Sequence, residues 1–135
     1  MLNDECLILN RRVMSDNVIL GKSSDFAVRV VKLYKHLCDD QKEYVLSKQL
    51  LRSGTSIGAN INEAQAGQSK ADFIAKMAIA SKEARESKYW INLLIKTDYL
   101  NKDDKHVQTL VSEIDEIVRL LTSIVKSSQE NHFGK

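Results

Sequence analysis

Proline is absent from this 135-residue chain, and glycine occurs only five times. At the average usage of ~5%, a chain of this length would contain roughly seven prolines. Because proline and glycine are the residues that most often interrupt helices, their scarcity favours long helices. Hydrophobic residues make up 43% of the chain, which is enough to build the core of one domain.

An excess of charge of one sign is also lacking, since 20 basic residues face 18 acidic ones and the net charge is +2. This balance excludes a disordered polyelectrolyte and argues against a histone-like basic protein. No hydrophobic run approaches the ~18 residues that a transmembrane helix requires. The sequence therefore predicts no membrane span.

Cysteine is scarce, and its two copies lie far apart in the sequence. Cys6 and Cys38 form neither a C-x-x-C pair nor a disulfide framework. The first residues are acidic where a signal peptide is positively charged, and the apolar run 6–9 is too short for one. These features predict a cytoplasmic protein with reduced thiols.

The motifs of common enzymes are missing. The three histidines, His36, His106 and His132, are isolated, and neither H-x-x-x-H nor E-x-x-H occurs. The segment G-T-S-I-G at 54–58 lacks the lysine and the preceding strand of a phosphate-binding loop. No serine can be assigned to a catalytic triad. The sequence thus predicts no catalytic residue, no metal site and no cofactor, so a metal-dependent or small-molecule enzyme is disfavoured.

Residues 1–23 show no clear periodicity, and Met14 followed by Ser15 and Asp16 resembles an internal start. We therefore expect 1–23 to be a poorly ordered N-terminal extension. The helical domain is expected over 24–126, and the polar segment 127–135 is expected to be a frayed tail.

Apolar residues between these ends recur at spacings of three and four, which is the pattern of amphipathic helices. Ser24 and Ser69 are the expected N-caps of the first and third helices, and Gly67 is the expected stop of the second. Four such helices with short connections predict an all-α, antiparallel, up-down four-helix bundle. The predicted helices are 24–38, 43–66, 69–97 and 103–126.

Two glycines, Gly54 and Gly58, lie inside the second predicted helix. Each costs about 1 kcal/mol relative to alanine in a helix interior, so a neighbouring helix is expected to pack closely against them.

The helix predicted over 69–97 has a second apolar face opposite its core stripe. A helix that is apolar on two faces is usually buried on both, which predicts an interface between subunits. The alternative is that the alanines are good helix formers on an exposed surface, and the larger side chains of this face favour the interface. The candidate interface residues are Ala71, Ala75, Ala78, Tyr89 and Leu93.

Basic residues line another side of the same helix. Repeated around an oligomer, such a strip could hold the phosphates of a nucleic acid. The alternative is a solvated face with pairs such as Lys82 and Glu86, and the pattern alone favours this alternative. The candidate nucleic-acid-binding residues are Lys70, Arg85, Lys88 and Lys96.

Four polar residues lie on one flank of the second predicted helix, at spacings of four, four and three. They are Arg52, Ser56, Asn60 and Glu63. If buried, Arg52 needs a carboxylate, which Glu83 or Glu86 of the same or another subunit could provide. The alternative is a plain solvated flank.

The segment LRSGTSIGANINEA at 51–64 resembles the R-S-x-x-S-I-x-x-N-I-x-E signature of a four-helix-bundle family. This family includes proteins encoded in intervening sequences of large-subunit ribosomal RNA genes and the accessory variability determinant of diversity-generating retroelements. The segments 72–74 (DFI) and 79–86 (IASKEARE) look like the second block of the family. The resemblance covers about 24–125, and it departs from the family at Asn62, which is often another residue.

This resemblance implies a homopentameric barrel of four-helix bundles. It also implies nucleic acid or a nucleic-acid-processing protein as partner, because the retroelement member binds nucleic acid and a reverse transcriptase through a basic surface. Nothing in the sequence transfers the retroelement role itself. Two hypotheses follow: a non-enzymatic oligomer that binds RNA or a ribonucleoprotein through basic strips, and a protein-interaction scaffold without nucleic-acid binding.

Overall fold

The computed structural model describes the backbone of residues 4–133 and the side chains of residues 18–132. It consists of four helices: α1 (Asp4–Asp39), α2 (Leu46–Gln65), α3 (Lys70–Lys96) and α4 (Lys105–Phe133). No strand occurs within 4–133, so the predicted all-α class is confirmed.

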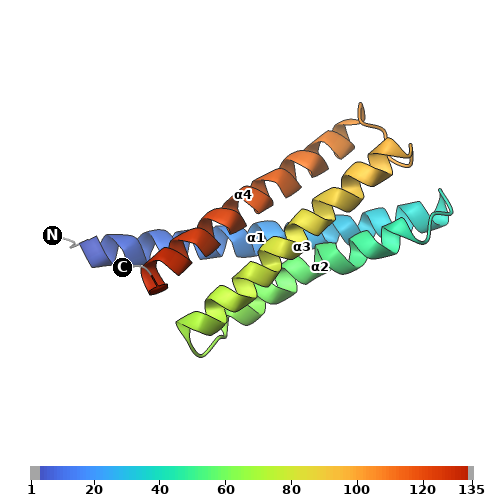
Figure 1. Cartoon of the computed structure of the whole chain (residues 1–135). Coiled ribbons are helices and arrows are strands. Elements are labelled where there is room, and N and C mark those ends of the chain that lie inside the picture. Colours follow the sequence, from blue (N-terminus) through green and yellow to red (C-terminus); the bar gives the residue numbers. More distant parts are fainter. Residues whose placement is uncertain (1–3, 134–135) are drawn as a thin grey trace.

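The four helices form an elongated bundle in which the chain reverses direction at each short connection (Figure 1). Helix α1 packs against α2 and α4, and α3 packs against the same two helices from the other side. Helices α1 and α3 are therefore diagonal to each other. One long face of α3 is left without a neighbour in the single chain.

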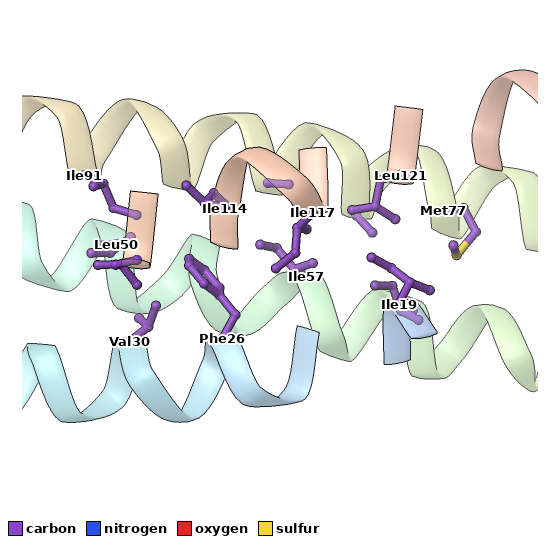
Figure 2. Close-up of a cluster of buried hydrophobic side chains, with 14 of the residues drawn as sticks. Ile19, Phe26, Val30, Leu50, Ile57, Met77, Ile91, Ile114, Ile117 and Leu121 are labelled. Atoms are coloured by element: carbon purple, nitrogen blue, oxygen red, sulfur yellow. The ribbon is translucent and has the colours of Figure 1, made fainter. Parts of the chain in front are cut away.

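The core runs along the bundle axis and contains the periodic apolar residues predicted from the sequence. Figure 2 shows side chains from all four helices meeting there, with Phe26, Ile57, Met77 and Ile117 among them. All four of these side chains are fully buried. Small residues in the middle of α3, such as Ala80 and Ala84, are also fully buried, which lets the helices approach closely.

The predicted start of the first helix at Ser24 is wrong, because α1 begins twenty residues earlier, at Asp4. Ser24 lies exposed within this helix rather than at its cap. The core stripe continues through Ser23 to Ile19, both of which are buried. Sequence periodicity missed this extension because Ser23 is polar; its hydroxyl donates to the backbone oxygen of Leu20 (3.1 Å). The expectation about disorder in residues 1–3 lies outside the described residues.

The predicted tail after residue 126 is wrong for the same reason. Helix α4 continues to Phe133, and Ser128 is buried on its core side, four residues after Ile124. A buried serine again interrupts the apolar pattern without interrupting the helix. Residues 134 and 135 lie outside the described part of the chain.

Helix α2 begins at Leu46, three residues later than predicted, because Glu43 caps it. The Glu43 carboxylate accepts hydrogen bonds from the backbone N–H groups of Val45 (3.1 Å), Leu46 (2.8 Å) and Ser47 (2.7 Å). In return, the Ser47 hydroxyl donates to the backbone oxygen of Glu43 (2.8 Å). These bonds satisfy donors that a helix start leaves free.

The end of α2 and the start of α3 agree better with the sequence prediction. Ser69 is the N-cap, and its side chain accepts a hydrogen bond from the backbone N–H of Asp72 (3.1 Å), as predicted. The end of α2 also agrees, with Gly67 following directly after the last turn.

The Glu43 cap makes the stability of α2 depend on pH. Burial alone would raise the pKa of the Glu43 carboxyl, but the hydrogen bonds from Ser47, Leu46 and Val45 lower it below its ordinary value. Because the pKa of Glu43 is lower in the folded state than in the unfolded state, its carboxylate stabilises the fold at pH values above the unfolded-state pKa. This contribution is lost as the pH falls through the folded-state pKa. We expect E43Q to lose about 2 kcal/mol at neutral pH. Denaturant unfolding at pH 7 and at acidic pH measures this, and a difference between variant and parent that does not shrink in acid contradicts the cap.

Candidate functional surfaces

The polar flank of α2 is joined to α3 within one chain. The Arg52 guanidinium contacts Glu83 (Nη1–Oε2 3.1 Å) and also forms an ion pair with Glu86. Glu83 and Glu86, the two partners that the sequence suggested for a buried Arg52, both contact it, although Arg52 is not buried. Half of the Arg52 side chain remains exposed, at 50%.

The single tryptophan of the chain belongs to the same cluster. The Trp90 indole N–H donates to Glu86 Oε2 (3.0 Å), and the Trp90 ring meets Tyr89 edge-to-face at a centroid distance of 5.0 Å. The hydrogen bond from Trp90 lowers the pKa of the Glu86 carboxyl, burial opposes this, and the ion pair with Arg52 lowers the pKa further. Glu83 and Glu86 thus face one guanidinium, and Lys82 is a further positive neighbour of Glu86.

Tryptophan fluorescence can follow this cluster directly. We expect the Trp90 emission to change when Glu86 is protonated, at a pH below the ordinary range of a glutamate. In R52Q the midpoint of this change should rise, since a positive neighbour that favours the carboxylate is gone. A midpoint that is the same in R52Q and the parent protein would contradict the ion pair.

The remaining members of the flank do not gather around Arg52. The Asn60 amide donates to the backbone oxygen of Ser56 (2.8 Å), within α2 itself. Glu63 forms an ion pair with Lys76 of α3 (3.0 Å), three helical turns away from Arg52. A buried hydroxyl contact between Ser53 and Ser87 (2.9 Å), which the sequence did not predict, joins the two helices directly beside the Arg52 ion pairs. The signature segment therefore fastens α2 to α3 rather than forming one pocket.

The predicted basic strip of α3 is not continuous. Lys70 and Lys96 are the first and last residues of α3, which puts them about 39 Å apart. Lys88 forms an ion pair with Asp115 of α4 (2.9 Å), and Arg85 donates to the hydroxyl of Thr122 of α4 (3.2 Å). Only Arg85 and Lys88 lie close together, beside α4.

The predicted second apolar face of α3 points away from the other helices. Ala71, Ala75 and Tyr89 are exposed, Tyr89 to 58%, while Ala78 and Leu93 are partly buried. Ile79, which is not among the predicted interface residues, adds a large apolar side chain that is 43% exposed. Exposed apolar side chains that share one helix face are typical of surfaces that contact other proteins.

The hollows among the described residues are shallow features of the surface. A polar hollow of about 320 Å³ lies at the α2–α3 connection, and an apolar one of about 150 Å³ lies between α1 and the start of α4. Within the described part of the chain, no three histidine, cysteine or acidic side chains are placed to hold a metal ion. None of the helices there is long and apolar enough to cross a membrane.

The glycines of α2 pack against α1. A Cβ atom built on Gly54 would lie 2.9 Å from Cγ2 of Val30, whereas one on Gly58 would meet Ser23 Oγ at an ordinary 3.5 Å. The close helix contact expected at these glycines is thus tightest at Gly54.

Comparisons with known proteins agree with this fold. A family model described as "23S rRNA-intervening sequence protein" matches residues 15–123. A solved structure from Bacteroides thetaiotaomicron, described as a protein with unknown function from the S23 ribosomal protein family, is 54% identical with a TM-score of 0.79. The match covers 83% of this chain and 98% of that one. No curated protein matches the sequence.

Proposed function

Because the chain belongs to the family of 23S rRNA-intervening sequence proteins, we propose that it is a non-enzymatic, oligomeric RNA-binding protein. The observation that carries this proposal is the pair of surfaces on α3: an exposed apolar face suited to self-association, and the exposed Arg85 beside α4, whose guanidinium suits phosphates. Neither the family nor the solved relative has an enzyme name. An rRNA partner would place the protein in the cytoplasm, as the sequence predicts.

The assembly that we propose is a homopentameric ring. Each copy would bury the outer face of α3, with Ala71, Ala75 and Tyr89, against its neighbour. This face is open in the single chain because α3 packs only on α2 and α4. Alanines let two helix backbones approach closely, and Tyr89 supplies apolar area with a polar end.

RNA would contact the basic side chains of α3, for which Lys70, Arg85, Lys88 and Lys96 are the candidates. We expect replacement of all four by glutamate to abolish binding of a fluorescein-labelled RNA hairpin while the oligomer persists. Anisotropy titrations over a range of salt concentrations measure this, and binding of the unaltered protein should weaken steeply with salt. Unchanged binding by the fourfold variant would remove these residues from the site.

The pairing of cations within the chain favours a second candidate, a protein-interaction scaffold without a role in nucleic-acid binding. Lys22, Lys76 and Lys88 each have a carboxylate partner, which reduces the charge offered to phosphates. A protein partner that remains bound after nuclease treatment, together with failure to bind the RNA hairpin, would support the scaffold instead.

A further inference from the structure

Positive side chains gather where α3 packs against α4, around the hydroxyl group of Thr122. Arg85 of α3 donates to this hydroxyl (Nη2–Oγ1 3.2 Å). On α4, Arg119 lies three residues before Thr122 and Lys126 four residues after it, so both share its side of the helix. The pattern of α3 alone does not indicate these two residues, because they belong to α4.

The charge of these three side chains is available to a ligand. Arg85, Arg119 and Lys126 are exposed, and no ion pair to any of them occurs among the side chains that the structure describes. Arg85 uses one of its five N–H donors on Thr122, which holds the guanidinium across the gap between the helices and leaves the others free.

Two carboxylates of α4 on the side of this group toward the helix start are paired within the chain. Asp115, one turn before Arg119, is held by Lys88 (2.9 Å), and Glu116 forms an ion pair with Lys22 of α1. Among the side chains described on α4 from residue 117 onward, Glu130, one turn after Lys126, is the one acid, and it is exposed. The face is therefore positive, although the whole chain carries only +2.

We propose that Arg85, Arg119 and Lys126 form the phosphate-binding face of this protein, and that its ligand is the backbone of RNA. This inference rests on the proposed RNA-binding function and changes its site. Arg119 and Lys126 are about 10 Å apart along α4, so the two side chains can contact different phosphates of one strand. Arginine suits such a face because its planar donors can bind a phosphate with two bonds. Lys70 and Lys96 lie about 22 Å and 16 Å along α3 from Arg85, so they are outside it.

The test compares two double variants with the same change in net charge. R119E/K126E reverses the face, and K32E/K35E reverses two exposed lysines on α1, away from it. Binding of a fluorescein-labelled RNA hairpin is measured by anisotropy as a function of salt, and circular dichroism checks that each variant is folded. We expect R119E/K126E to weaken binding at least roughly thirtyfold at 0.15 M salt and to lower the salt slope by about two. K32E/K35E should bind nearly as well as the parent protein.

A third variant tests the same face by an expected gain in RNA affinity rather than a loss. E130Q removes the remaining acid beside Lys126, and we expect it to strengthen RNA binding. Equal losses in the two double variants, or binding that survives R119E/K126E, overturn the assigned face but leave the RNA-binding function standing. Failure of the unaltered protein to bind the hairpin overturns both.

Discussion

Replacing Gly54 by alanine is expected to destabilise the bundle, whereas the same replacement at Gly58, one turn later, should stabilise it or leave it unchanged. A Cβ at Gly54 would lie 2.9–3.0 Å from both methyl groups of Val30, which is fully buried and cannot turn into open space. The clash adds an overpacking cost of about 1–3 kcal/mol, which offsets and exceeds the gain of about 1 kcal/mol in helix propensity.

At Gly58 the expected change in stability has the opposite sign. The nearest atom to a new Cβ there is Ser23 Oγ at 3.5 Å, which is an ordinary contact. Alanine there gains helix propensity without a clash. Leucine at either position exceeds the space, and G54L should cost about 3 kcal/mol or more. Thermal and urea unfolding of G54A, G58A, G54L and G58L measure these differences. Equal effects of G54A and G58A would show that the α1–α2 distance is not limited by Val30.

Acidic residues on the outer face of α3 are expected to dissociate the oligomer without unfolding the chain. Ala71 and Ala75 are exposed in the single chain, so A71E/A75E costs no buried packing there. Ala71 lies in the first turn of α3, where negative charge is favoured by the helix dipole. In a ring, however, the variant would bury two charges in an apolar contact between copies.

We expect the mass of A71E/A75E to fall to that of one 15.3 kDa chain while its circular dichroism stays unchanged. The matched control is V28E, which places an acid on α1, the helix diagonal to α3, at a side chain that is already 51% exposed. V28E should keep the mass of the parent protein. An A71E/A75E variant that remains fully assembled would exclude this face of α3 as the subunit contact.

The sequence predicts this fold well where apolar residues carry the helical period, and it fails where polar residues replace them. Phe26, Ile57 and Ile117 follow the period and lie in the core. Ser23 and Ser128 occupy core positions as well, but a serine in an otherwise apolar stripe looks like its end. Their burial depends on how closely neighbouring helices approach, which only the three-dimensional arrangement shows.

The same distinction applies to the candidate surfaces. The partner of Arg52 was predictable, because a half-buried guanidinium needs a carboxylate and Glu83 and Glu86 lay at suitable positions on α3. Arg119 and Lys126 were not predictable as neighbours of Arg85. Their proximity depends on the register between α3 and α4, and no pattern within one helix encodes that register.

We propose that this protein assembles through α3 and carries RNA on its surface. Size-exclusion chromatography with light scattering can test both parts of this proposal, on protein untreated with nuclease and read at protein and nucleic-acid wavelengths. We expect a mass of at least five chains, about 77 kDa, together with absorbance at nucleic-acid wavelengths that disappears after ribonuclease. A monomer of 15.3 kDa without nucleic acid would contradict both parts of the claim.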